Sequence, residues 1–242
     1  MEYRNLGRSG VMVSAVGLGT DQFGERVDEP TVAQIIGTAL DQGINFIDTA
    51  DVYGNRERSE LYIGSAIQGH RHEIVLATKG QSAMGDGPND RGASRYHLMS
   101  ALEGSLRRLG TDHVDLYQIH WFDPRTPMDE TMRTLDEMVR SGKVRYIGAS
   151  NYAAWQLAVC NDMARTHGWE PFITVQPHYH MFERDVEKEI LPYCRYASLG
   201  VLPYFPLAGG LLANPNYRYQ APPPAGTRAA GPDWTRSYYM RY

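Results

Sequence analysis

Four side chains of types that transfer protons each follow a short apolar run in this sequence. They are a carboxylate, a phenol, an ammonium and an imidazole: Asp48, Tyr53, Lys79 and His120. The runs span residues 44–54, 73–80 and 114–121. If these runs are strands of one parallel sheet, the residues at their C-terminal ends meet on one face. Together these groups suit proton transfer at a carbonyl or an alcohol.

Each of the four has a chemical role that its type allows. Tyr53 is the candidate general acid, although a free phenol has a pKa of about 10. We expect the Lys79 ammonium to lower the pKa of Tyr53 by stabilising the phenolate. Asp48 would pair with Lys79, since a buried ammonium needs a partner. His120 would orient the substrate oxygen or share in the proton relay. Taken singly, each residue would more often be structural.

Composition places the chain among soluble globular proteins. The 242 residues are enough for one large domain or two small ones, with 42% hydrophobic and 21% charged residues. The net charge of −4 gives no reason to expect binding to nucleic acid or to an anionic membrane. Cys160 and Cys194 lack metal-ligand spacing and fit a reducing compartment. We find neither a signal peptide nor a membrane-spanning run, and therefore expect a cytoplasmic protein.

Strand and helix patterns alternate along most of the chain. A hairpin is expected around Gly7 to Gly10, and helices near 28–43, 94–110, 132–142, 153–168 and 183–194, the last shortened or kinked by Pro192. Seven strand candidates lie at 15–20, 44–50, 73–79, 114–121, 144–150, 172–178 and 200–205. This alternation predicts a parallel α/β sheet with helices outside, either a (β/α)8 TIM barrel or a doubly wound open sheet. Residues whose side chains could take part in catalysis lie at the ends of many different strands, which favours the barrel.

Two features of the sequence depart from a complete barrel. No eighth strand pattern follows residues 200–205, and the composition changes near Asn214. We therefore expect an incomplete barrel over residues 1–213 and an irregular Pro/Tyr/Arg-rich tail, a loop or disordered, over 214–242. Open strand edges would favour self-association. The chain would be a fragment, a shortened gene product, or one whose gap a second chain covers.

Several motifs together resemble the aldo-keto reductase superfamily. The resemblance runs from about Tyr3 to Leu212 and rests on FIDTADVYGNRERSELYIG, VLATKG, VDLYQIHW, GKVRYIGASNY, VQPHYHMFERDVEKEILPYC and GVLPYFPLAGGLL. It implies a (β/α)8 barrel that reduces aldehydes and ketones with a nicotinamide cofactor, normally NADPH. NADH is not excluded, because the segment that discriminates the two is absent. The resemblance also implies that Asp48, Tyr53, Lys79 and His120 form the catalytic tetrad.

The same resemblance implies a set of cofactor-binding residues. Ser150, Asn151 and Gln176 would hydrogen-bond the nicotinamide carboxamide, and Tyr204 would stack on its ring. The loop along the pyrophosphate and the first-strand backbone would contribute Pro206, Leu207, Gly209 and Leu211, and Gly19 and Thr20. We expect no metal site, because His178 and His180 lack a third ligand.

The missing eighth strand leaves a second interpretation open. The segment that normally grips the adenosine end of the cofactor is absent, so activity would be impaired. The alternative to an NADP-dependent enzyme is a non-catalytic cofactor-sensing or regulatory subunit, or an inactive truncated fragment of the same fold. The sequence does not name the carbonyl substrate, because substrate loops vary widely on this fold.

Overall fold

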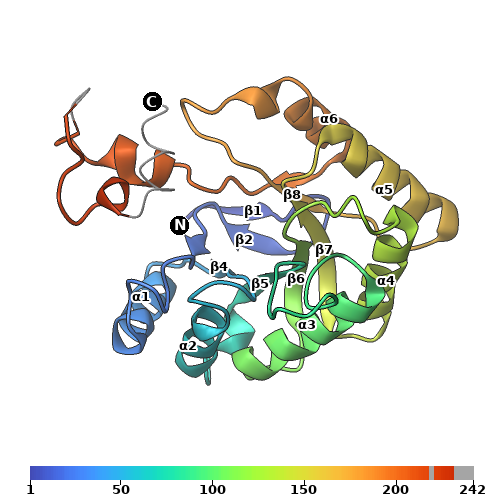
Figure 1. Cartoon of the computed structure of the whole chain (residues 1–242), viewed down its shortest axis with the longest axis horizontal. Helices are drawn as coiled ribbons and strands as arrows, with labels where there is room; N and C mark the ends of the chain where they lie inside the picture. Colours follow the sequence, from blue (N-terminus) through green and yellow to red (C-terminus); the bar gives the residue numbers. More distant parts are fainter. Residues whose placement is uncertain (218–220, 232–242) are drawn as a thin grey trace.

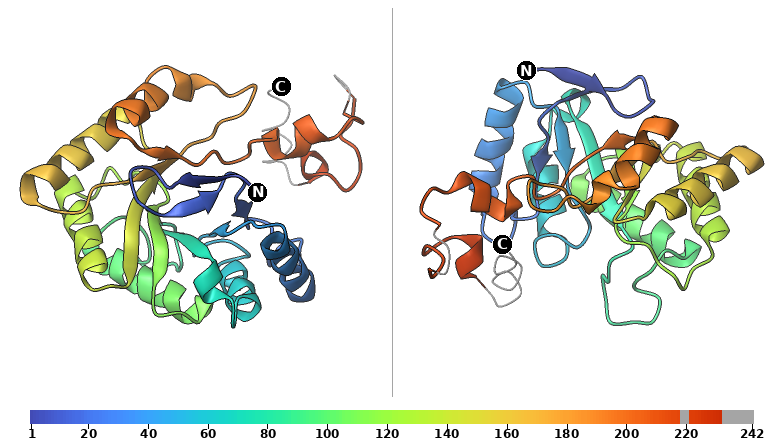
Figure 2. Two further views of the ribbon diagram at one scale, coloured as in Figure 1. Left: turned by 180° about the vertical axis from the view of Figure 1, so that it is seen from behind. Right: turned by 90° about the horizontal axis from the view of Figure 1, so that it is seen from above.

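Seven parallel strands form one curled sheet, with hydrogen-bonded neighbours in the order of the sequence (Figures 1 and 2). The computed structural model describes residues 1–217 and 221–231. The strands are β3 (Leu18–Gly19), β4 (Phe46–Asp48), β5 (Val75–Gly80), β6 (Val114–Ile119), β7 (Val144–Ser150), β8 (Thr174–Gln176) and β9 (Gly200–Val201). The order never reverses, so the doubly wound alternative is wrong and the strands follow the barrel plan. Within the described ranges, no eighth parallel strand follows β9.

An antiparallel hairpin packs against the same sheet, as its glycines predicted. It consists of β1 (Tyr3–Asn5) and β2 (Met12–Ser14). Leu6 and Val13 of this hairpin join a buried apolar cluster with strand residues such as Leu116. Gly7 lies between the two strands with a φ of 57°, and a Cβ there would lie 2.1 Å from the Ile173 carbonyl oxygen. Only glycine fits so close an approach of two backbones.

Helices cover the outer face of the sheet, each between successive strands (Figure 1). Asp28 accepts a hydrogen bond from the Thr31 amide and caps α1, and Ser94 accepts one from the His97 amide and caps α3. Gly110 ends α3 in the left-handed conformation. Among the described residues, the helices are α1 (Glu29–Asp41), α2 (Arg58–Ala66), α3 (Arg95–Leu109), α4 (Met128–Arg140), α5 (Ala154–His167) and α6 (Ile190–Ala197).

Two of these helices differ from the sequence expectation. The nine-residue α2 was not predicted, because it is short and its stripe of apolar residues is weak. The last helix begins only at Ile190, so that Pro192 lies in its first turn, where no N–H is needed. Short 3-10 turns occupy Arg71–Glu73, Asp185–Glu187, Ala208–Ala213 and Arg228–Ala230. No helix of the described residues is long and apolar enough to cross a membrane.

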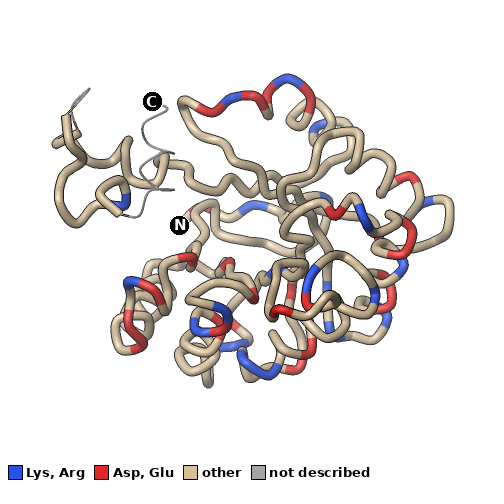
Figure 3. The backbone as a smooth tube through the Cα atoms, in the orientation of Figure 1, with Lys and Arg blue, Asp and Glu red and all other residues tan. Residues whose placement is uncertain are grey.

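The described part of the expected tail touches the end of the sheet near β3 and β9. Arg228 forms an ion pair with Asp21, 2.5 Å from Nη2 to Oδ2, and its guanidinium lies 5.0 Å from the ring centre of Phe205. Ala229 is fully buried. The remainder of that expected tail, residues 218–220 and 232–242, lies outside the described residues. Elsewhere, acidic and basic residues are intermixed along the backbone of the outer helices and loops (Figure 3).

A buried ionic cluster lies between α2, α3 and the sheet. Arg108 Nε donates to Glu60 Oε2 at 2.7 Å, and Thr78 Oγ1 donates to Glu60 Oε1 at 2.5 Å. Asp51 is also fully buried, and neither of its carboxylate oxygens has a hydrogen-bond partner among the described residues. Burial, and then the negative charge of Glu60, raise the pKa of Asp51 well above its usual value.

We therefore expect Asp51→Asn to stabilise the protein at neutral and alkaline pH. A carboxyl whose pKa is raised by folding makes folding less favourable as pH rises above the unfolded value of about 3.9. The gain in melting temperature from Asp51→Asn should thus be larger at pH 8 than at pH 5. Thermal unfolding of both proteins at the two pH values measures it. An equal or opposite difference would show that Asp51 is charged and well solvated in the folded state.

Candidate active site

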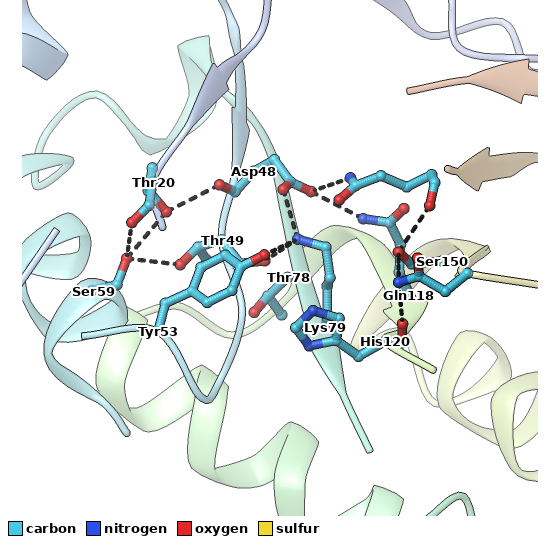
Figure 4. Close-up of polar contacts among 12 residues, drawn as sticks. Thr20, Asp48, Thr49, Tyr53, Ser59, Thr78, Lys79, Gln118, His120 and Ser150 are labelled. Atoms are coloured by element: carbon cyan, nitrogen blue, oxygen red, sulfur yellow. Dashed lines mark hydrogen bonds and ion pairs between the residues drawn. The ribbon is translucent and has the colours of Figure 1, made fainter. Parts of the chain in front are cut away.

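The four predicted proton-transfer residues converge around one buried ammonium. Lys79, at the end of β5, has no exposed surface. Its Nζ donates to Asp48 Oδ2 at 2.6 Å, to the Thr49 carbonyl oxygen at 2.8 Å and to the Tyr53 hydroxyl at 3.4 Å (Figure 4). An ammonium has three N–H donors, so these acceptors satisfy all of them. The predicted pairing of Asp48 with Lys79 is present, and Tyr53 lies within reach of the same charge.

Two glutamine amides hold the other oxygen of Asp48. Gln118 Nε2 donates to Asp48 Oδ1 at 3.0 Å, and Gln176 Nε2 donates to it at 2.9 Å. Sequence reasoning missed Gln118, although its position carries a signal. Residues 116 and 118 of β6 and residue 120, which follows the strand, point to the same face. Residue 118 is a polar residue on this inward face. A fully buried polar side chain at this register needs a partner, and Asp48 provides it.

His120 lies against Tyr53 with the two rings edge to face. Their centroids are 5.7 Å apart at an interplanar angle of 80°. The ring Nδ1 lies 3.1 Å from the hydroxyl oxygen of Ser82, a second residue that sequence reasoning missed. Burial, and then the positive charge of Lys79, lower the pKa of His120 to about 3. The imidazole is therefore neutral at physiological pH.

Lys79 lowers the pKa of Tyr53 as expected, but the net shift of that pKa is upward. Burial raises the pKa of this phenol above its usual value, and the Lys79 charge offsets that effect only in part. The physical reason is that the buried phenolate loses its solvation, while the charge of Asp48 opposes that of Lys79. For Lys79 itself, burial lowers the pKa, but the charges and hydrogen bonds of Asp48 and Tyr53 together outweigh burial, and the net shift is upward. Both groups therefore hold their protons at neutral pH.

Four of the residues predicted to bind the cofactor are joined in a network that also includes His120. Ser150 Oγ donates to the Gln176 carbonyl oxygen at 2.9 Å, and Asn151 Nδ2 donates to Ser150 Oγ at 3.0 Å and to the His120 carbonyl oxygen at 3.1 Å. Tyr204 completes it, because its hydroxyl donates to Asn151 Oδ1 at 3.0 Å. These bonds tie the C-terminal ends of β6, β7 and β8 to the segment after β9.

The remaining predicted residues lie around the same end of the sheet. Thr20 donates from both its amide and its hydroxyl to the Asp48 carbonyl oxygen, at 3.1 and 3.0 Å, and so joins β3 to β4. The neighbouring Gly19 is exposed at the end of β3. Gly209 has a φ of 62°. Pro206 and Leu207 are exposed after β9, and Leu211 is half-buried in the 3-10 turn Ala208–Ala213.

Among the polar groups predicted to bind a nicotinamide carboxamide, Gln176 Oε1 is better placed to do so than the Asn151 amide. Within the described residues, no group donates to Gln176 Oε1, so this oxygen can accept from a carboxamide NH2. Both N–H groups of the Asn151 amide are already used. Tyr204 stacks on His178, with centroids 5.0 Å apart and planes 11° apart, and Phe205 lies edge to face with it at 5.5 Å. In the described ranges, no three His, Cys, Asp or Glu side chains gather as metal ligands.

Comparison of the sequence with known proteins shows which family the chain resembles. The model of the aldo/keto reductase family matches residues 15–238. The chain is 46% identical over 240 residues to the uncharacterized oxidoreductase YrpG of Bacillus subtilis, covering 95% of this chain and 72% of that protein. It is 39% identical over 218 residues to the aldo-keto reductase YhdN of the same species, covering 88% and 64%.

A fungal relative extends the comparison. The versiconal hemiacetal acetate reductase of Aspergillus parasiticus is 36% identical over 241 residues, covering 89% of this chain and 70% of that protein. The chain thus spans 64% to 72% of the length of these three relatives.

We predict that breaking the buried ion pair between Asp48 and Lys79 destabilises the protein. Asp48→Ala leaves the Lys79 ammonium buried without its counter-charge and should lower the free energy of unfolding by about 3–5 kcal/mol. Adding Lys79→Met to Asp48→Ala removes that charge and should recover part of the loss. Urea unfolding of the two single variants and the double variant measures the coupling.

The exposed ion pair of Lys143 with Glu103 provides the control. Glu103→Ala should lower the free energy of unfolding by at most about 1 kcal/mol, because solvent screens the pair. If Asp48→Ala has as small an effect as Glu103→Ala, the Lys79 ammonium reaches water and is not held by Asp48.

Proposed function

Because the chain belongs to the aldo/keto reductase family, we propose that it reduces aldehydes or ketones to alcohols, with Tyr53 as the general acid. One observation carries the proposal: a single buried ammonium, Lys79, contacts both the Asp48 carboxylate and the Tyr53 hydroxyl. Reduction of a carbonyl adds a hydride to carbon and a proton to oxygen. The chain supplies the proton donor, and we propose NADPH, with NADH as the second choice, as the hydride source.

Each residue of the cluster has a separate task in this proposal. Tyr53 donates its proton to the carbonyl oxygen as that oxygen takes on the negative charge of an alkoxide, which is a stronger base than a phenolate. The phenolate that remains lies 3.4 Å from the Lys79 ammonium, which stabilises it. Asp48 holds Lys79 in place, and the neutral imidazole of His120 orients the carbonyl oxygen.

The residues proposed to hold the cofactor lie beside this cluster. Gln176, with Ser150 and Asn151, would bind the carboxamide, and Tyr204 would stack on the nicotinamide ring. The backbone of Gly19 and Thr20 and the segment with Pro206, Leu207, Gly209 and Leu211 would line the rest of the cofactor. A reduced nicotinamide in this place supplies the hydride to the carbonyl carbon.

An exposed aromatic side chain suggests which carbonyl to use as a probe. Trp121 is 51% exposed and stacks on the His120 ring, with centroids 6.3 Å apart. A flat apolar surface beside the proposed proton donor favours an aromatic aldehyde over a small aliphatic one. Benzaldehyde with excess NADPH is therefore the first assay.

Tyr53→Phe should lower the rate of benzaldehyde reduction by about 10²–10⁴-fold, because it removes the general acid. NADPH affinity, followed by quenching of protein fluorescence, should stay nearly unchanged. Tyr96→Phe, at an exposed position on α3, is the control and should leave both quantities unchanged. Near wild-type turnover in Tyr53→Phe would contradict the proposed acid. Binding of NADPH by the unaltered chain without any turnover would instead favour a non-catalytic cofactor-binding protein.

The pH dependence of the reaction tests the electrostatics around Tyr53. The rate should fall as pH rises through the pKa of Tyr53, because the acid must hold its proton. The charge of Lys79 lowers that pKa and the charge of Asp48 raises it. The fall should therefore move to higher pH in Lys79→Met and to lower pH in Asp48→Asn. Shifts in the same direction, or none, in profiles of kcat/KM would mean that another group is the acid.

A further inference from the structure

The segment that follows β5 brings a serine hydroxyl to the imidazole ring of His120. Ser82 Oγ lies 3.1 Å from His120 Nδ1. Ser82 is only three residues beyond Lys79, so the strand that places the ammonium also places this hydroxyl. Nothing in the proposed mechanism uses Ser82, and its residue type alone did not single it out.

The backbone that holds Ser82 is itself unusual. Gln81, between β5 and Ser82, has a φ of 105°, which is rare for a residue with a side chain. Its carbonyl oxygen accepts a hydrogen bond of 2.9 Å from the Gly92 amide, which closes the loop. A strained conformation of this kind persists only where the surrounding structure holds it, and such residues cluster at functional sites. The strain at Gln81 therefore marks Ser82 as a residue whose position is fixed.

The groups around His120 determine what the Ser82 hydroxyl can do. The Lys79 charge acts on the ring, the phenol of Tyr53 lies edge to face with it, and Trp121 stacks on it. The positive charge of Lys79 and the burial of the ring oppose a second ring proton. A neutral imidazole has one N–H, so its two nitrogens have opposite roles: one donates and the other accepts. The hydrogen bond made by one nitrogen decides the role of the other.

We propose that Ser82 is a positioning residue whose hydroxyl donates a hydrogen bond to His120 Nδ1 and thereby keeps the single imidazole proton on Nε2. The Nε2–H group is then a hydrogen-bond donor for a carbonyl oxygen, whereas the opposite tautomer would present a lone pair and repel it. The catalytic meaning of this tautomer rests on the proposed carbonyl reduction. The tautomer itself is a property of the chain without any ligand.

Nuclear magnetic resonance of the ligand-free protein with 15N-labelled histidine tests the tautomer directly. The chain has eight histidines, and the signals lost in His120→Gln identify the ring of His120. Two-bond correlations from the ring carbon protons distinguish the protonated nitrogen from the bare one. We expect Nε2–H in the unaltered protein, a mixture with Nδ1–H in Ser82→Ala, and a return to Nε2–H in Ser82→Thr.

A matched serine provides the control. Ser9 also donates its hydroxyl in a loop, to the Leu6 carbonyl oxygen, and lies in the hairpin away from His120. Ser9→Ala should leave the His120 signals unchanged. An Nδ1–H tautomer in the unaltered protein, or the same tautomer in Ser82→Ala as in the unaltered protein, would overturn the proposal.

Kinetics with benzaldehyde then separate this inference from the proposed function. Ser82→Ala should lower kcat by about tenfold, as expected for the loss of one hydrogen bond, with NADPH affinity unchanged, and Ser82→Thr should restore kcat. A chain that shows the tautomer response but reduces no carbonyl would contradict the proposed function and leave the inference about Ser82 intact. Normal kcat in Ser82→Ala together with a changed tautomer would refute the link between the tautomer and catalysis.

Discussion

The burial of the Lys79 ammonium is the constraint on which the rest of the site depends. A buried cation is tolerated only when its three N–H groups and its charge are all matched. The acceptors are Asp48 at the end of β4, the Thr49 carbonyl oxygen and the hydroxyl of Tyr53, so the ends of β4 and β5 must lie side by side. Asp48 needs its own donors and takes them from β6 and β8. One cation thus fixes the relative positions of four strands.

Residue types at strand ends were enough to predict the centre of this site. Asp48, Lys79 and His120 each close an apolar run, and parallel strands bring such ends together whatever the lengths of the loops. Gln118 could not be found in the same way, because an amide inside a strand is compatible with many partners. Ser82 depends on the backbone of a loop, and a left-handed Gln81 leaves no pattern in the sequence. The short α2 was missed for a similar reason: packing against α1 and α3 stabilises it, rather than its own periodicity.

The residues predicted to bind the cofactor show a different limit of sequence reasoning. Asn151 has the donor and acceptor needed for a carboxamide, but the structure uses them to join His120 to Tyr204. Its left-handed backbone, with a φ of 57°, is one that asparagine adopts more readily than most residues. The same residue type therefore fits both a structural and a binding role. Because the network fixes the Asn151 amide, any ligand there meets a surface whose polar groups already point in set directions.

The balance of charge in the cluster explains why a buried phenol with a raised pKa suits this chemistry. Asp48 and Lys79 cancel each other, His120 is neutral, and Tyr53 keeps its proton, so the four groups carry no net charge before reaction. A neutral carbonyl can enter such a site without meeting an unbalanced field. In the proposed reaction, negative charge develops on the carbonyl oxygen, beside a phenol that would donate its proton and an ammonium that would stabilise the phenolate. The proposed mechanism thus needs a phenol that keeps its proton until charge develops on the substrate, and an ion pair that stabilises the charge once it has developed.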